Sequence, residues 1–318
     1  VMYTVLIAGA GQLGSRHLQG VKTSSKELDI WVYDLSKESL KVAEERYNQV
    51  ETNVSKTVHF VSETDLLPLH FDIAIVACSS KPRLAICKLL LAHSVIKFLV
   101  LEKFLFTSLS EYDEADKLFK EKGVKVWVNC PRRMFGYYDK INDLLNKNSL
   151  INMNFYGKDW GMCCNTIHFV DIFMKLCGEK SFEIDFSSIE PKVIESKRAG
   201  YVEFYGTEKF LTPNGNTLSL TCLSETNVEN VIKITNGSLN IELFEARQVM
   251  KINGSEEAIS VRYQSQLSGL VVDSLIEQSS CALATYLESA EFHKTYLKGI
   301  LNLYNQATGA EHDSCPIT

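Results

Sequence analysis

Three glycines near the N-terminus are spaced so that backbone amides can hold a phosphate group. They lie in residues 9–14 (GAGQLG), directly after the apolar run 3–8 and at the start of a segment with helical periodicity. The first glycine permits a tight turn, the second lets the backbone approach a pyrophosphate, and the third lets the helix pack closely. The alternative is a glycine-rich turn without a ligand. The residues expected to contact a dinucleotide here are Gly9, Gly11, Gln12, Leu13 and Gly14.

A carboxylate follows the second apolar run. Asp34 comes directly after residues 29–33 and lies twenty residues after Gly14. A carboxylate at this place accepts hydrogen bonds from both adenosine ribose hydroxyls and repels a 2′-phosphate. Asp34 could instead only start the next helix. The sequence therefore favours NAD as the cofactor, with NADP as the weaker alternative because Ser36 and Lys37 lie close by.

Polar side chains also follow the fourth and fifth apolar runs. Ser79 and Ser80 come after residues 72–77, and Glu102 and Lys103 come after residues 98–101. The carboxyl ends of parallel strands are where α/β proteins bind ligands. We therefore expect both serines and Glu102 to contact the cofactor and Lys103 to lie beside the nicotinamide. The serines could equally cap the helix that follows them.

These groups require a scaffold of parallel strands. Up to about residue 129, short β-branched apolar runs alternate with longer stretches of helical period, which is typical of a parallel sheet covered by helices. We therefore predict that residues 1–129 form a doubly wound α/β sheet of the Rossmann type. The expected strands are residues 3–8, 29–33, 58–61, 72–77, 98–101 and 125–128.

The pattern changes after Pro131, so we place a second domain at residues 130–318. Helical patterns near 135–146 and 163–177 precede several strand-like runs joined by turns such as Asn236-Gly237, and a helical tail covers about 270–307. Neighbouring antiparallel strands follow from this pattern, which makes the second domain α+β. The expected strands are residues 201–205, 217–222, 230–235, 238–244 and 260–263.

One of these helices carries a histidine beside its apolar stripe. Apolar residues recur with spacing 4-3-4-3 from residue 163 to residue 177 and must face the core, which places His168 and Asp171 on the adjoining stripe. An imidazole at the edge of the buried face can point into a cleft and exchange a proton at neutral pH. A lone histidine on such a helix is more often structural.

Composition limits the class of ligand. The chain has 318 residues, 45% of them apolar and 23% charged, and its net charge of -6 is spread without a polybasic stretch. Duplex nucleic acid and anionic membranes are therefore not expected as partners, and the ligand is expected to be small. Nine cysteines without a Cys-x-x-Cys pair predict reduced thiols, a cytoplasmic protein and no metal site.

Taken together, the motifs resemble the glucose–fructose oxidoreductase, inositol dehydrogenase and rhizopine-catabolism (Gfo/Idh/MocA) family. The resemblance implies a Rossmann domain, a second domain with a large open sheet, and oxidation or reduction of a secondary alcohol on a sugar or cyclitol. It also implies a homodimer or homotetramer in which an otherwise exposed apolar face of the open sheet pairs between subunits. The residues that carry it are 9–14, Glu102-Lys103, 129–135, 168–171 and 283–297.

The resemblance implies that Lys103 and His168 are the catalytic residues that handle the proton. Phe104 stands where the family has the proline of its Glu-Lys-Pro motif, and Cys164 stands where it usually has an aspartate. Asn165, beside that cysteine, can hydrogen-bond a substrate hydroxyl, but an amide cannot transfer a proton as a carboxylate does.

Two arginines lie at the junction between the domains, where a family arginine often binds substrate. Guanidinium groups at Arg132 and Arg133 suit a phosphate or carboxylate, and ion pairs that hold the domains together are the alternative. Asp171, one turn after His168, is also assigned to substrate binding. Trp160 could stack on a sugar ring or pack in the core.

We therefore expect an NAD-dependent oxidoreductase that transfers a hydride to or from a secondary alcohol carbon of a sugar, cyclitol or nucleotide sugar. The alternative is a non-catalytic sensor or regulator that binds the dinucleotide on the same fold. Cys164 supports this alternative because an acid is expected at its position.

Overall fold

The apolar runs of the first half form one sheet. Its strands are β1 (Tyr3–Ala8), β2 (Leu28–Tyr33), β3 (Lys56–Val61), β4 (His70–Val76), β5 (Val95–Glu102) and β6 (Lys125–Asn129). They are all parallel and lie in the order β6-β5-β4-β1-β2-β3, to which β17 (Ala284–Thr285) adds antiparallel beside β6. This doubly wound order confirms the predicted Rossmann-type sheet.

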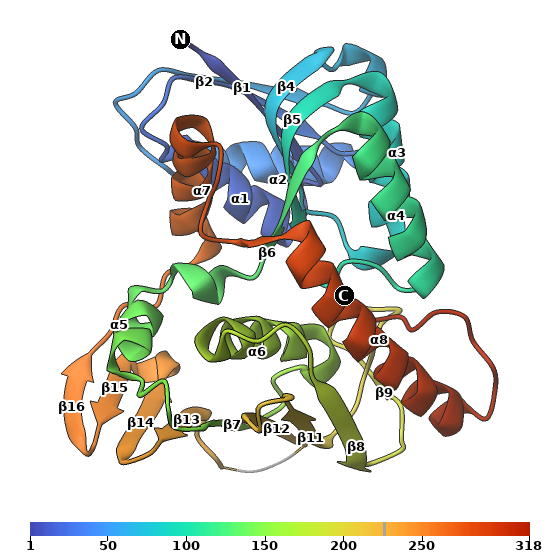
Figure 1. Ribbon diagram of the computed structural model, residues 1–318. Helices are drawn as coiled ribbons and strands as arrows, with labels where there is room; N and C mark the ends of the chain where they lie inside the picture. Colours follow the sequence, from blue (N-terminus) through green and yellow to red (C-terminus); the bar gives the residue numbers. More distant parts are fainter. Residues whose placement is uncertain (225–226) are drawn as a thin grey trace. The chain divides into compact units, whose positions relative to one another are not determined.

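Helices cover this sheet, and one of them comes from the far end of the chain (Figure 1). The helices are α1 (Gln12–Lys22), α2 (Lys37–Asn48), α3 (Ser80–His93), α4 (Leu109–Lys122) and α7 (Gln264–Gln278). α7 packs tightly on α1, because a Cβ atom at Gly20 would lie 2.8 Å from the carbonyl oxygen of Gln264. A Cβ atom at Gly269 would lie 2.5 Å from the carbonyl oxygen of Gly20. Glycine at both positions lets the two backbones meet.

The computed structural model describes residues 1–224 and 227–318, and these form two compact units. The first unit comprises residues 1–106, 110–131 and 262–286, and the second comprises 107–109, 132–261 and 287–318. Residues 262–286 thus return to the first unit, so the units are not separated by one boundary near residue 130.

The second unit is built on an eight-stranded sheet in the order β16-β15-β14-β13-β7-β12-β11-β8. Neighbouring strands are antiparallel except for the parallel pair β7 and β12, which confirms the predicted mainly antiparallel sheet. A separate ribbon pairs β9 (Ile194–Glu195) with β10 (Val202–Glu203). The strands of the large sheet are β7 (Ile151–Lys158), β8 (Glu183–Ile189), β11 (Gly206–Leu211), β12 (Thr217–Leu223), β13 (Val231–Asn236), β14 (Leu239–Phe244), β15 (Val249–Ile252) and β16 (Ser255–Ala258).

The strands of the second unit differ from the sequence prediction in several places. Strands β7, β8, β11, β15 and β16 lie outside the predicted strands, and the predicted strand 201–205 contributes only β10 of the separate ribbon. In the central strand β7, Met153 and Phe155 alternate with more exposed residues. Residues 260–263, predicted as a strand, form none. Instead Tyr263 is the N-cap of α7, and its amide donates a hydrogen bond to Oε1 of Gln266, 2.9 Å away. A short β-prone run at this place serves as a helix start because no neighbouring strand pairs with it.

Helices α5 (Gly136–Leu144), α6 (Met162–Cys177) and α8 (Tyr286–Thr308) complete the described part of the second unit. Figure 1 shows α6 lying along the sheet. Gly161 and Gly178 take left-handed backbone conformations at the two ends of α6 and so delimit it. Cys163, Ile167 and Val170 are fully buried, as the predicted apolar stripe requires.

The outer face of the large sheet is mostly polar. Thr217 donates a hydrogen bond to Asn152 across the strands at 2.7 Å, and the hydroxyls of Thr207 and Thr221 lie 2.9 Å apart. Lys233 extends from the same face. The predicted apolar face is therefore wrong for this chain, and pairing of subunits through it stays a prediction.

A carboxyl group is enclosed in the core of the second unit. Glu208 on β11 is fully buried, and its two oxygens accept hydrogen bonds from Thr166 on α6 and Tyr296 on α8, each at 2.6 Å. Burial raises the pKa of Glu208 to about 7, because the hydrogen bonds offset only part of the lost hydration. Glu208 thus links two helices to the sheet.

We predict that Glu208→Gln raises the melting temperature at pH 8 and leaves it unchanged near pH 4. The pKa of Glu208 is about 7 in the folded chain and 4.5 ordinarily. The cost of its buried charge, about 3 kcal/mol, is therefore full above pH 7 and absent below pH 4.5. Calorimetry across this range measures the difference between variant and wild type. Glu183→Gln, at an exposed position of β8, is the control. A difference in melting temperature between Glu208→Gln and wild type that is the same at every pH would contradict the prediction.

Candidate functional site

The glycine turn has the geometry that a dinucleotide requires. Gly9 has φ +100°, and a Cβ atom at Gly14 would lie 1.8 Å from the carbonyl oxygen of Gly9. A Cβ atom at Gly11 would meet no atom within 4 Å, so the backbone there faces open space. The helix α1 begins at Gln12, immediately after this opening. A pyrophosphate fits this turn, because its charge would meet the free amides of the helix start.

Asp34 braces the turn. Its Oδ2 accepts a hydrogen bond from the amide of Ala10 at 2.7 Å, and its Oδ1 accepts one from the amide of Ser36 at 2.8 Å. Ser36, and not Asp34, is the N-cap of α2, so the alternative that Asp34 only starts this helix is wrong. The contact of Asp34 with the ribose stays a prediction. Each carboxylate oxygen keeps acceptor capacity for a ribose hydroxyl.

A residue that the sequence motifs do not mark also reaches this turn. Arg46, near the end of α2, donates a hydrogen bond from Nη2 to Oε1 of Gln12 at 2.7 Å and from Nη1 to Oγ of Ser15 at 2.5 Å. No local spacing in the sequence indicates this contact, because α2 brings Arg46 there through the tertiary fold. Its guanidinium adds positive charge at the start of α1.

The two predicted serines follow β4. Ser79 is the N-cap of α3 by its backbone conformation, but its hydroxyl makes no capping hydrogen bond. Ser80 is fully buried. Ser79 therefore remains the better candidate of the two for a contact with the cofactor.

Glu102 is turned into the core of the first unit. Only 3% of it is exposed, and its Oε1 accepts hydrogen bonds from Nε2 of His17 at 2.7 Å and from Nδ2 of Asn129 at 2.5 Å. His17 Nδ1 in turn lies 2.8 Å from Oγ of Ser268 on α7. Burial raises the pKa of Glu102, but its contacts with His17 and Asn129 outweigh burial and hold the pKa below its usual range. Glu102 thus joins α1, β5, β6 and α7, and its carboxylate is oriented away from the solvent.

Lys103 directly follows β5 and is half-buried. The peptide bond between Lys103 and Phe104 is cis, and the Phe104 side chain is fully buried. The structure therefore places Lys103 at the carboxyl edge of the parallel sheet, as predicted from its position after the fifth apolar run.

The second unit contains a pocket of about 280 Å³ beside α6. His168 and Asn165 line it from α6, and the aromatic side chains of Phe155, Trp160 and Phe169 form much of its wall. Nδ2 of Asn165 donates a hydrogen bond to the carbonyl oxygen of Trp160 at 2.7 Å, which fixes the loop before the helix. The structure thus brings two predicted site residues together with an aromatic surface.

Arg132 reaches the same pocket as one half of an ion pair. Its Nη1 donates to Oε1 of Glu245, which also accepts a hydrogen bond from Tyr137 at 2.6 Å. The guanidinium stacks over the Phe169 ring at 4.5 Å. Burial lowers the pKa of Arg132, but the charge of Glu245 outweighs burial and raises it overall. Glu245 belongs to no recognisable sequence motif and lies far from Arg132 in the sequence. The sequence therefore could not indicate that the two residues form an ion pair.

Arg133 and Asp171 lie apart from this pocket. Nε of Arg133 donates to Oδ2 of Asp171 at 2.7 Å, and its Nη2 donates to Oε1 of Glu288 at 2.9 Å. Asp171 is fully buried, and burial raises its pKa to about 6 against the opposing charge of Arg133. The pair anchors α6 one turn after His168. A structural role therefore explains both residues better than the predicted contact with substrate.

Cys164 occupies the position at which the family resemblance predicts an acid. Its side chain is half-buried, and its sulfur lies 3.8 Å from Oγ of Ser196. The residues that line the pocket are Arg132, Phe155, Trp160, Asn165, His168, Phe169, Asn230, Ile232, Leu243, Glu245 and Ala246. Glu245 is therefore the carboxylate of this pocket, and Arg132 holds it.

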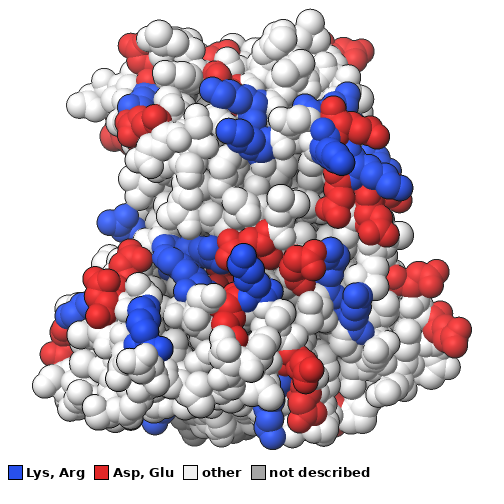
Figure 2. Space-filling model, in the orientation of Figure 1, with Lys and Arg blue, Asp and Glu red and all other residues white. Residues whose placement is uncertain are grey.

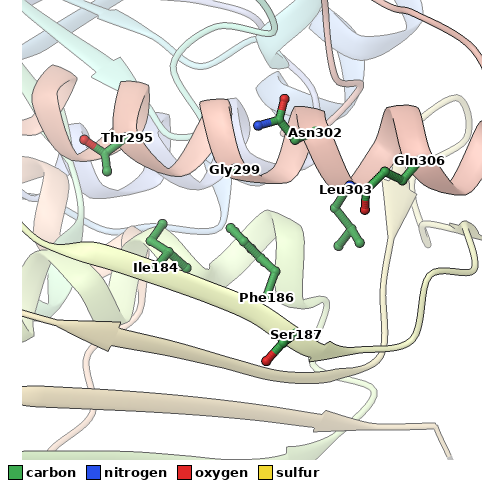
Figure 3. Close-up of a pocket in the computed structure, with 8 residues that line it drawn as sticks. All are labelled: Ile184, Phe186, Ser187, Thr295, Gly299, Asn302, Leu303 and Gln306. Carbon is green, nitrogen blue, oxygen red and sulfur yellow. The ribbon is translucent and has the colours of Figure 1, made fainter.

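A second pocket, of about 400 Å³, lies between β8 and α8 (Figure 3). Ile184 and Phe186 point from the strand toward the helix, whereas Asn302 points away. Gly299 makes room for the ring, because a Cβ atom there would lie 2.2 Å from Phe186 Cε2. All residues that line this pocket are uncharged, so it offers no group for proton transfer.

Surface charge, helix composition and possible metal ligands concern three other kinds of partner: nucleic acid, membrane and metal ion. Figure 2 shows acidic and basic side chains interspersed on the face in view. No helix among the described residues combines the length and the apolar character needed to cross a membrane. Within the same residues, histidine, cysteine and carboxylate side chains form no group of three or more that could hold a metal ion.

Residues 3–130 match the model of the Gfo/Idh/MocA oxidoreductase family, described as an NAD-binding Rossmann fold. The match is confined to this part of the chain, which corresponds to the predicted dinucleotide-binding domain. The match confirms the family resemblance and the predicted class of cofactor. No curated protein sequence matches the chain.

Solved structures share the fold over nearly the whole chain. UDP-N-acetylglucosamine 3-dehydrogenase from Acidithiobacillus ferrooxidans has a TM-score of 0.71 at 12% identity, covering 96% of this chain and 99% of that chain. For myo-inositol 2-dehydrogenase from Lactobacillus plantarum the TM-score is 0.68 at 14% identity, with 98% of each chain covered. Biliverdin reductase from Synechocystis, in complex with biliverdin and NADP+, has a TM-score of 0.68 at 14% identity and covers 96% of this chain and 99% of its own.

We predict that Asp34→Asn weakens NADH binding by about 10- to 100-fold, because hydrogen bonds to a charged acceptor contribute about 1.5–3 kcal/mol. NADPH should lose less affinity, since the substitution removes the carboxylate that repels a 2′-phosphate. Fluorescence titration gives both dissociation constants. Asp29→Asn is the control, because Asp29 lies on β2, the strand that ends just before Asp34, and is bonded to Trp31 and Thr57. Unchanged NADH affinity in Asp34→Asn would refute the ribose role.

Proposed function

We propose that the protein is an NAD-dependent oxidoreductase that transfers a hydride to or from a secondary alcohol carbon of a sugar, cyclitol or nucleotide sugar. One observation carries the proposal: the second unit of a chain with an NAD-binding domain has a pocket in which His168 and Asn165 lie beside aromatic rings. Aromatic faces bind the apolar faces of sugar rings, and the polar groups bind hydroxyls.

The chemistry needs a proton acceptor together with the hydride acceptor. The bound cofactor supplies nicotinamide C4 as the hydride acceptor or donor. As the carbon–hydrogen bond of the alcohol breaks, its hydroxyl loses a proton, and in reduction both transfers reverse. In this proposal the Lys103 ammonium polarises the developing alkoxide and the imidazole of His168 exchanges the proton. The proposal thus assigns one proton-handling residue to each unit of the chain.

The pocket also bears on the charge of the substrate. The guanidinium of Arg132 is paired with Glu245, and that of Arg133 with Asp171 and Glu288. A phosphate or carboxylate would have to displace one of these acids. We therefore propose that the part of the substrate inside the pocket is an uncharged ring. In a nucleotide sugar, the phosphates would then lie outside it.

Cys164 favours a second candidate function, that of a non-catalytic sensor. A thiol in place of the expected acid leaves the chain without a second carboxyl at that position, which suits a sensor that binds the dinucleotide without turnover. The two functions differ in a measurable way, because a sensor binds NADH tightly and oxidises none of it.

We expect NADH or NAD turnover with at least one member of a panel of sugars, cyclitols and nucleotide sugars. Lys103→Ala and His168→Ala should each lower kcat by about 100-fold or more, because general acid–base groups contribute about 10²- to 10⁴-fold. NADH absorbance gives the rates, and fluorescence titration checks that NADH affinity is retained.

His59→Ala is the control, since His59 is an exposed histidine on β3. Biliverdin belongs in the panel, because a biliverdin reductase shares the fold. Tight NADH binding without turnover of any sugar, cyclitol or nucleotide sugar would overturn the proposed function.

A further inference from the structure

Arg83 is a buried cation without a carboxylate partner among the described residues. It lies on α3 and is 1% exposed. Within the described chain its guanidinium bonds only to backbone carbonyl oxygens, and its Nε has no partner. Arg133, also buried, meets the carboxylates of Asp171 and Glu288 instead. Because a buried charge loses its hydration, a buried arginine without an acid beside it points to a specific role for the guanidinium.

The guanidinium connects two loops at the carboxyl edge of the parallel sheet. Nη1 donates to the carbonyl oxygens of Phe104 and, at 2.7 Å, of Leu105, and Nη2 donates to that of Cys78 at 2.5 Å. Phe104 directly follows Lys103. Cys78 lies against the dinucleotide turn, because a Cβ atom at Gly9 would be 2.9 Å from its amide nitrogen. One side chain therefore holds the loop of the candidate catalytic lysine to the loop beneath the cofactor turn.

Only an arginine can make this connection. Its planar guanidinium presents several N–H donors in a fixed fork, whereas a lysine ammonium is a compact point charge. Charge-assisted hydrogen bonds to three carbonyl oxygens also partly replace the hydration that the cation loses. The bonded atoms belong to the backbone, so the clamp depends on the path of the chain and not on the side chains at residues 78, 104 and 105.

We propose that Arg83 is the positioning residue for Lys103. By holding the carbonyl groups of Phe104 and Leu105, the two residues that follow Lys103, the guanidinium keeps the lysine amine in place for proton transfer. This inference rests on the proposed function, because it takes the role of Lys103 from there. Arg83 itself is buried and acts through Lys103, without a contact to the substrate.

The test compares Arg83→Gln, which loses the charge and the fork, with Arg83→Lys, which keeps the charge alone. We expect Arg83→Gln to lower kcat by about 100-fold, since small misplacement of a catalytic group has effects of that size. The KM of the substrate and the NADH dissociation constant should change by less than about 3-fold, as expected when only the transition state loses an interaction. Arg83→Lys should restore little of kcat.

A double variant separates positioning from a general structural role. If Arg83 acts through Lys103, Arg83→Gln has no further effect on kcat in the Lys103→Ala background, whereas independent effects multiply. Lys88→Gln on the same helix, which breaks a surface pair with Glu114, is the control for changes in α3. Multiplying effects, or wild-type kcat in Arg83→Gln, would overturn the inference.

Hydrogen exchange tests the clamp independently of turnover. In Arg83→Gln and Arg83→Lys, the amides of residues 103–106 should exchange about 10-fold faster or more, with the core strands β1 and β4 unchanged. If no substrate is turned over, the proposed function fails, and exchange at residues 103–106 still decides whether the clamp exists. Unchanged exchange there would overturn the clamp. Acceleration across the whole sheet would show that Arg83 supports the fold in general, and it too would overturn the inference.

Discussion

The buried carboxylate of Glu102 is the contact on which the cofactor unit depends. Nε2 of His17, in the helix that starts at the glycine turn, lies 2.7 Å from its Oε1, and Nδ2 of Asn129 at the end of β6 lies 2.5 Å away. Asn129 also donates to Gln264 on α7, a helix that arrives from near the end of the chain. A charge in the core is stable only when such partners replace its water. Glu102 directly precedes Lys103 and is bonded to His17 in the helix after the glycine turn. One buried side chain therefore connects the turn and the lysine.

The candidate sites of the two units are built from different kinds of groups. In the first, the candidate cofactor site consists largely of backbone groups, namely the turn at Gly9 to Gly14 and the helix start after it. In the second, side chains form the pocket, and its charges are already matched, as in the pair Arg132 and Glu245. A backbone site suits a cofactor common to many enzymes, whereas a side-chain pocket can be altered residue by residue for a particular substrate.

Prediction from sequence succeeded where the signal is local and periodic. The six parallel strands carry apolar runs separated by helical patterns, and all six are present. In the second unit, β7 lies at the middle of the sheet, but its alternation of Asn152, Met153 and Asn154 includes no β-branched cluster that marks it as a strand. Residues 260–263 have strand-like composition but no neighbouring strand, so capping of α7 by Tyr263 decides their conformation.

The sequence by itself determined the dinucleotide turn and Asp34, because their chemistry depends on backbone conformation and spacing within a few dozen residues. Only the tertiary structure decided which polar groups are available to a ligand. Asp171 was assigned to the substrate, but it is buried against Arg133, 38 residues away, and Arg132 is paired with Glu245 at a separation of 113 residues. Such pairings arise from the folding of distant segments onto one another, and no local pattern encodes them. The conformation of the glycine turn follows from its own glycines and from Asp34, only 24 residues away, whereas the charge that an arginine presents depends on which distant residue the fold places beside it.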